Sequence, residues 1–277
     1  MPGDPPGLVI GLSYTVSGDP HRPTVLFLHG FLGSSADWAD AIPALDERFY
    51  CIAPDLPGHG RSLGLTPQLY TIKGAAKMLR DLLDELEISR AALAGYSMGG
   101  RLALYLALLH PERCSRLFLE SASPGIEDAA ERELRREADE ERASRLESDD
   151  FGEFLADWYR QPLFASLARH GGLVRETIET RLRNDPGELA RSLRGMGAGS
   201  QPSLWGELAA LQVPALAVAG ELDEKFVGIS VRMASLGPRI RAAAVPGAGH
   251  NVRLESPEEY LATLESFLWQ PSTSWVG

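Results

Sequence analysis

A serine stands between two glycines in the segment Gly-Tyr-Ser-Met-Gly at residues 95–99, which matches the pattern Gly-x-Ser-x-Gly. In this pattern the serine occupies a sharp turn from a strand into a helix, where only small neighbours let the chain pass. A short apolar run precedes the segment and a helical pattern follows it, so the context fits. We therefore predict that Ser97 is a catalytic serine whose hydroxyl is activated by other side chains.

An acid and a histidine follow Ser97 in the chain order that this motif requires. Asp223 stands in GELDEKF just past one predicted strand, and His250 stands in the glycine-rich segment PGAGHN after another. In such a triad the acid orients the imidazole, and the imidazole takes a proton from the serine hydroxyl. Glu221 and Glu224 are alternative acids, and Asp223 is preferred because its position after the strand fits best.

Two backbone N–H groups are expected to form an oxyanion hole beside Ser97. One donor comes from the loop HGFLGS at residues 29–34, and the other comes from the residue after the serine. These donors would belong to Phe31 and Met98. His59 lies in the nearby segment DLPGHGRS, but the sequence identifies no acidic partner for it, so we expect no catalytic role there.

The elements that must position these residues alternate along the chain. Short apolar runs typical of strands occur at residues 24–30, 50–56, 91–97, 116–121, 214–221 and 241–249. Helical patterns lie between them, for example at residues 69–86 and 102–109. This alternation predicts an α/β protein with a mostly parallel sheet covered by helices on both faces, and residues 7–18 could add an antiparallel edge pair.

The rhythm changes between Pro124 and about Ser200, where strongly charged helical patterns replace strands. We expect a helical insertion over the carboxyl ends of the strands, where open α/β folds bind ligands. The predicted organisation is therefore a first core part at residues 1–123, a helical lid at 124–202 and a second core part at 203–277. Most lid charges are expected to form a solvated helix face.

Composition narrows the classes of partner and compartment. The net charge of −11 argues against nucleic acid or an anionic membrane as partner, so an anionic small substrate would need a local basic patch. The opening residues lack the pattern of a secretory signal, and the longest apolar run, Leu102 to Leu109, is too short to span a bilayer. Cys51 and Cys114 fit no metal or redox pattern, so a cytoplasmic protein is expected.

These motifs resemble the α/β-hydrolase superfamily over nearly the whole chain. A finer resemblance rests on GYSMGGR, SPGI, ADWYRQPLFASL and GELDEKF with PGAGHN, together with LHGFLGSSADW and LPGHGRS. The set is similar to 2-succinyl-6-hydroxy-2,4-cyclohexadiene-1-carboxylate synthases of menaquinone biosynthesis. The most specific pieces are the arginine of GYSMGGR and the segment DWYRQPLF.

The resemblance implies elimination of pyruvate from a tricarboxylate, with Ser97 acting as a base and with neither metal nor organic cofactor. It implies that carboxylates are bound by Arg101, Arg135 and Arg183, since a guanidinium binds a carboxylate at two points. It also implies an aromatic wall of Trp158, Tyr159 and Phe164, with Tyr96 beside the serine. Because every basic residue of the predicted lid is arginine, three rivals remain open, namely Arg132, Arg136 and Arg181.

Three other interpretations stay open at this point. A carboxylesterase or C–C bond hydrolase would use the same triad with Ser97 as an acyl nucleophile. A non-catalytic ligand-binding member of the superfamily is a second possibility, although the intact set of serine, acid and histidine argues against it. Arg101 could instead serve the fold through a salt bridge at the sheet edge.

Overall fold

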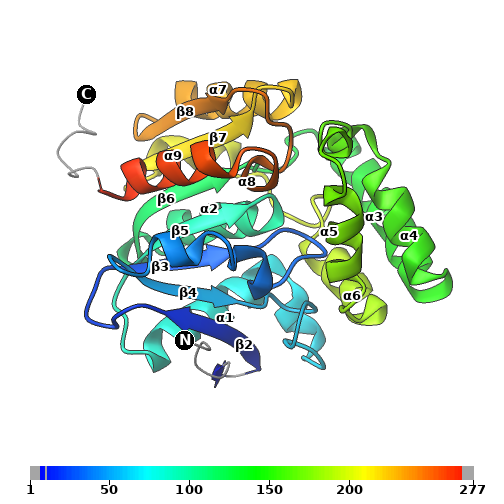
Figure 1. Ribbon diagram of the computed structural model, residues 1–277, viewed down its shortest axis with the longest axis horizontal. Coiled ribbons are helices and arrows are strands. Elements are labelled where there is room, and N and C mark those ends of the chain that lie inside the picture. The colour runs from blue at the N-terminus through cyan, green and yellow to red at the C-terminus, as the bar shows by residue number, and fades with distance from the viewer. Residues whose placement is uncertain (1–6, 10, 270–277) are drawn as a thin grey trace.

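The computed structural model describes residues 7–9 and 11–269 of the chain, and these residues form one eight-stranded sheet (Figure 1). The strands lie in the order β1-β2-β4-β3-β5-β6-β7-β8. Their bounds are β1 Gly7–Val9, β2 Leu12–Ser17, β3 Thr24–Leu28, β4 Tyr50–Pro54, β5 Ala91–Tyr96, β6 Cys114–Glu120, β7 Ala215–Gly220 and β8 Ile240–Val245. β1 pairs antiparallel with β2 and β2 with β4, whereas the other neighbours pair parallel. The predicted parallel sheet with an antiparallel edge is thus confirmed.

Helices cover both faces of the sheet because its central strands are apolar on both sides. Along β3, Leu26 and Leu28 join the core cluster that contains side chains of α1, α2 and α7. Val25 and Phe27 point the opposite way, into a second cluster shared with α9. The helices of this core are α1 Ile72–Glu85, α2 Met98–Leu109, α7 Glu224–Leu236, α8 Val252–Glu255 and α9 Pro257–Trp269.

Between β6 and β7 the chain forms four helices that lie to one side of the sheet (Figure 1). They are α3 Ala129–Ser148, α4 Phe151–Tyr159, α5 Leu173–Arg181 and α6 Pro186–Met196. Asp128, Asp150 and Asp185 cap three of these helices, each accepting the backbone N–H three residues later at 2.8–2.9 Å. A separate apolar cluster, which includes Phe154 and Leu193, holds the four helices together.

Short 3₁₀ helices connect several of these elements. They are η1 Ser35–Trp38, η2 Ile42–Ala44, η3 Pro67–Tyr70, η4 Pro111–Arg113, η5 Pro162–Phe164, η6 Leu167–Arg169 and η7 Trp205–Ala210. The predicted core parts at 1–123 and 203–277 both extend past the described residues. No helix in the described ranges is both long and apolar enough to cross a membrane.

Candidate active site

Ser97 sits in the turn between β5 and α2 with φ +49° and ψ −107°. Its backbone is fixed on both sides, since its N–H donates to Glu120 O at 2.8 Å and its carbonyl accepts from Arg101 N at 3.0 Å. The turn has no room for larger neighbours: a Cβ on Gly99 would lie 2.1 Å from Leu28 O, and one on Gly95 would lie 2.6 Å from the Gly100 backbone. Steric exclusion therefore explains the glycines of the motif.

Asp223 and His250 meet at this end of the sheet. Asp223 follows β7 and caps α7, and its Oδ2 lies 2.7 Å from His250 Nδ1. Both side chains are buried, so the carboxylate can hold the Nδ1 proton and leave Nε2 as the basic atom of the ring. The alternative acids Glu221 and Glu224 are exposed, and only Asp223 among the three bonds to the imidazole.

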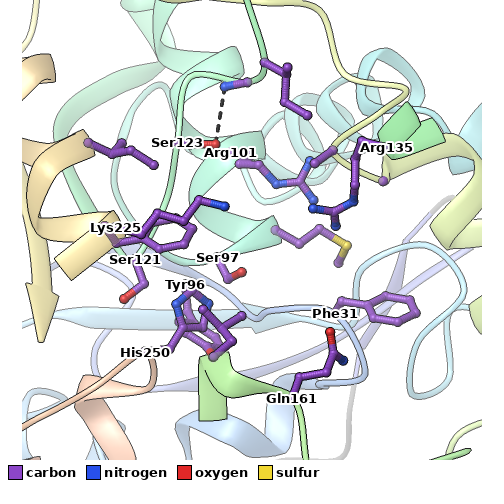
Figure 2. Close-up of a pocket in the computed structure, with 18 of the residues that line it drawn as sticks. Phe31, Tyr96, Ser97, Arg101, Ser121, Ser123, Arg135, Gln161, Lys225 and His250 are labelled. Carbon is purple, nitrogen blue, oxygen red and sulfur yellow. Dashed lines mark hydrogen bonds between the residues drawn. The ribbon is translucent and has the colours of Figure 1, made fainter. Parts of the chain in front are cut away.

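Aromatic rings surround the imidazole of His250 on several sides. The ring centroid of Phe226 lies 4.7 Å away, that of Tyr96 5.7 Å and that of Phe164 5.9 Å. Figure 2 shows Ser97 and His250 facing the same cavity. Within the described ranges no hydrogen bond joins the two side chains, and such catalytic bonds often tighten only when substrate binds.

The two residues predicted to supply oxyanion donors line the same cavity as Ser97. Met98 is the first residue of α2, where the helix supplies no acceptor for its N–H. Phe31 belongs to the loop after β3. The residue that follows it, Leu32, donates its N–H to His59 Nε2 at 3.2 Å. His59 is fully buried, and burial holds the pKa of its imidazole well below the ordinary value. It braces the loop and does not line the cavity.

A cavity of about 650 Å³ opens above these residues, between the sheet and the inserted helices. Most of the predicted site residues line it, namely Phe31, Tyr96, Ser97, Met98, Arg101, Arg135, Trp158, Tyr159, Phe164 and His250. Asp223 lies behind His250 and is not part of the lining. The cavity therefore joins residues from the serine turn, the histidine loop and the inserted helices.

Arg101 lines the cavity one turn after Ser97 (Figure 2). Its Nη1 donates to the neutral Gln201 Oε1 at 2.7 Å, and no carboxylate in the described part of the chain pairs with it. Burial, together with the nearby charge of Arg135, lowers the pKa of this guanidinium to about 10, although Asp139 opposes the change. The salt-bridge interpretation of Arg101 is therefore wrong, and the side chain presents a cation with a neutral partner.

The other predicted lid arginines differ from Arg101. Arg135 lines the cavity, but its Nε pairs with the buried Asp139 Oδ1 at 2.7 Å. The position predicted for Arg183 is wrong: its side chain is exposed and does not line the cavity. α5 ends at Arg181, and the chain then turns, so Arg183 faces away while Arg181 faces inward.

Arg181 was a rival in the sequence, and its side chain is already paired. Its Nη2 donates to Asp37 Oδ2 at 2.9 Å, Nη1 donates to Oδ1, and Nε donates to Tyr159 OH at 3.4 Å. Burial alone would raise the pKa of Asp37, but the guanidinium holds it below the ordinary value. The rivals Arg132 and Arg136 do not line the cavity.

Two functional candidates were missed in the sequence. Gln201 follows the inserted helices and provides the neutral partner of Arg101. Lys225, near the start of α7, lines the cavity and points into it beside Ser97 (Figure 2). It forms no ion pair in the described ranges. A signal was available for Lys225, because it follows Asp223 by two residues and is one of only three lysines.

Known proteins match this architecture over most of its length. The alpha/beta hydrolase fold family matches residues 23–257. The chain is 38% identical to the putative 2-succinyl-6-hydroxy-2,4-cyclohexadiene-1-carboxylate synthase of Bacillus subtilis (strain 168), covering 93% of this chain and 95% of that protein. It is 36% identical to the 2-succinyl-6-hydroxy-2,4-cyclohexadiene-1-carboxylate synthase of Serratia proteamaculans (strain 568), covering 92% and 96%.

A solved structure agrees with these relatives. The structure of MenH from S. aureus superposes with a TM-score of 0.88 at 34% identity, covering 92% of this chain and 97% of that one. Both levels of resemblance seen in the motifs are thereby confirmed. The chain belongs to the alpha/beta hydrolase fold family and, within it, to the family of 2-succinyl-6-hydroxy-2,4-cyclohexadiene-1-carboxylate synthases.

Proposed function

We propose that this chain eliminates pyruvate from 2-succinyl-5-enolpyruvyl-6-hydroxy-3-cyclohexene-1-carboxylate, giving 2-succinyl-6-hydroxy-2,4-cyclohexadiene-1-carboxylate. The product is the compound that names its relatives. The substrate carries three carboxylates, so its site must supply positive charge inside a protein whose net charge is −11. The reaction is a carbon–oxygen elimination and needs no water.

The observation that carries this proposal is the state of Arg101. A cation withdrawn from water is costly unless it is paired, yet no carboxylate among the described residues pairs with this half-buried guanidinium, and a neutral amide takes that place. A substrate carboxylate would complete the pair at two points. An esterase for neutral substrates gains nothing from a cation held one turn after its serine.

Further cations would bind the remaining carboxylates. Arg135 shares Asp139 with Arg142, so one buried carboxylate serves two guanidinium groups and positive charge is left over. Lys225 lines the same cavity from α7, whereas Arg135 and Arg142 belong to α3. The aromatic wall of Trp158, Tyr159 and Phe164 would cover the ring of the substrate, and residues 124–202 would act as a lid that excludes water.

The triad would supply the base for the elimination. Ser97 Oγ removes the proton next to the succinyl ketone while His250 takes the hydroxyl proton, and Asp223 stabilises the resulting imidazolium. Charge that develops on the ketone oxygen is stabilised by the N–H groups of Phe31 and Met98. The electron pair of the enolate then forms a new double bond in the ring. The existing ring double bond shifts toward the carbon that bears the enolpyruvyl group, and the C–O bond to that group breaks. Enolpyruvate leaves as its enolate and gains the proton held by His250, which gives pyruvate and restores the neutral imidazole.

The test offers the purified protein the enolpyruvyl tricarboxylate and a neutral ester side by side, with pyruvate and alcohol as the measured products. We expect pyruvate from the first and little alcohol from the second, and loss of pyruvate formation in Ser97→Ala. Alcohol release without pyruvate would replace the proposed elimination with an ester hydrolase using Ser97 as nucleophile.

A further inference from the structure

The backbone on both sides of His250 is bound by one side chain. Glu255 Oε2 accepts from Gly249 N at 2.9 Å, and Oε1 accepts from Asn251 N at 3.3 Å. The two N–H groups therefore converge on one carboxylate, with the catalytic-site histidine between them. Glu255 is the last residue of α8, so the loop and the following helix close into one bonded unit.

This carboxylate is withdrawn from solvent and from substrate. The Glu255 side chain is only 1% exposed, and it does not line the cavity. His170 Nε2, from the inserted helices, lies 3.9 Å from Oε2. The loop itself is confined from the same side, since a Cβ on Gly249 would lie 1.8 Å from Ser166 Oγ.

A second buried acid ties this unit to the serine turn. Glu120 ends β6, and its Oε1 accepts from Arg253 N, within α8, at 3.0 Å. The carbonyl of the same residue accepts the N–H of Ser97 at 2.8 Å. Glu120 thus contacts the backbone of the serine turn through its main chain and the backbone after the histidine through its side chain.

We propose that Glu255 is a positioning residue that holds the His250 imidazole in register with Ser97, with Glu120 anchoring the same unit to the serine turn. The proposal rests on the proposed triad, but it applies to any reaction at Ser97 that uses His250. The Asp223 bond and the neighbouring rings orient the imidazole, but they form no bond with the backbone that carries it and so do not themselves fix the position of that backbone. Glu255 fixes that position through both flanking peptide groups.

The test compares Glu255→Gln with the exposed control Glu259→Gln. A glutamine side chain keeps the volume, but its amide has only one oxygen and can accept from only one of the two N–H groups. Its NH₂ group, a donor, would then face the other N–H group. Because displacing a reacting group by about 1 Å can cost on the order of 100-fold, we expect kcat to fall roughly 10–100-fold. KM should stay within about twofold, because no group that faces the cavity has changed.

A second readout needs no substrate of the proposed pathway. The rate at which a fluorophosphonate labels Ser97 depends on the same imidazole, so it should fall by the same factor as kcat. Glu259→Gln should label at the wild-type rate. If wild type labels but forms no pyruvate, the proposed elimination fails while the positioning role is still tested by labelling.

A purely structural role gives a different result. Glu255→Gln would then show a lower Tm, but the folded protein would label Ser97 and turn over at the wild-type rate, which overturns the proposal. If the glutamine variant does not fold, Glu255→Asp replaces it. The shorter acid keeps the charge but cannot reach both N–H groups, so the same coupled loss of kcat and labelling is expected, and wild-type rates in that variant would also overturn the proposal.

Discussion

Ser97 combines backbone strain with a chemical task. Its φ of +49° lies in the left-handed region, which costs a non-glycine residue on the order of 1–3 kcal/mol. The surrounding hydrogen bonds to Glu120 and Arg101 hold the turn in place. The strain presents the hydroxyl to the cavity at the end of a strand, next to the N–H of Met98, for which α2 supplies no acceptor.

Removing any member of the triad should disable the same step. Ser97→Ala, Asp223→Asn and His250→Ala should each lower kcat by roughly 10³-fold or more, and double variants should lose little beyond the worst single one. Pyruvate release measures the effect, and circular dichroism checks the fold. Near-normal activity of His250→Ala on every substrate tried would remove the triad from the mechanism.

Arg101→Ala should lower kcat/KM by a factor equivalent to about 2–5 kcal/mol of transition-state binding, the range for removing one partner of a buried charge pair. Arg101→Lys should recover only part of this loss, because an ammonium group lacks the planar two-point contact. Tm should barely change, since Gln201 is the one hydrogen-bond partner of the guanidinium among the described residues.

The matched control for Arg101 is Arg183→Ala. Arg183 is exposed and outside the cavity, so its removal should leave kcat/KM unchanged. A destabilised Arg101→Ala protein that still eliminates pyruvate at the normal rate would contradict the carboxylate contact.

Lys225→Met should raise KM by roughly fivefold, the equivalent of about 1 kcal/mol for a charge contact in an exposed position. The effect should shrink in high salt, because exposed charges are screened. Lys73→Met provides the control, since Lys73 is exposed on α1 and does not line the cavity. Equal KM values for the two variants would exclude Lys225 from substrate binding.

At the scale of elements, the end of α5 is joined to the core by one buried ion pair. Arg181 ends that helix, and Asp37 lies in η1 after β3. The two side chains are 6% and 4% exposed. Asn184, three residues later, donates from Nδ2 to Leu32 O at 2.8 Å, next to the proposed oxyanion donor Phe31. These contacts connect the inserted helices to the loop that borders Ser97.

Asp37→Asn should destabilise the protein by about 3–5 kcal/mol, because it leaves the Arg181 guanidinium buried without its counter-charge. Urea unfolding of wild type and variant measures this difference. The double variant Asp37→Asn/Arg181→Met should be more stable than Asp37→Asn alone, since it removes the orphaned charge. A single variant as stable as wild type would show that the ion pair does not hold α5 to the core.

On the scale of the whole molecule, buried acids set how stability depends on pH. Burial, with a smaller contribution from neighbouring Glu255, raises the pKa of Glu120 from its ordinary value of 4.5 to about 7, although Arg253 opposes this change. Between these two values the folded state binds more protons than the unfolded state. The contribution of Glu120 to the free energy of unfolding therefore falls as pH rises through this window.

Glu120→Gln should remove this dependence while its amide oxygen still accepts from Arg253 N. Relative to wild type, the variant should gain stability between about pH 5 and about pH 8, by up to roughly 3 kcal/mol. Urea unfolding of both proteins at each pH gives the difference, in which the titration of other groups cancels. Glu258→Gln, an exposed change on α9, should show no such gain. An equal offset between wild type and Glu120→Gln at both pH values would contradict the raised pKa.

Local patterns in the sequence were sufficient for the parallel sheet, the serine turn and the acid and histidine that the structure brings together. Apolar runs with strand character depend on nearby residues. The serine motif is also local in sequence, although its glycines have different reasons: Gly95 is required by the Gly100 backbone within the turn, whereas Gly99 is required by Leu28 O at the end of β3. Arg101 could be placed for the same reason, because the turn fixes the register of α2 directly after it. The family resemblance rests on the same short motifs.

Only the tertiary structure decided which cations face the cavity and which of them are already neutralised. α5 carries charged side chains around much of its surface, so its periodicity does not separate Arg181 from Arg183. The partner of Arg181 lies 144 residues away, and that of Arg101 lies 100 residues away. Charge pairing over such separations depends on how the inserted helices pack on the sheet. The packing of the core helices α7 and α8 likewise brings Lys225 to the cavity of Ser97 and Glu255 behind His250.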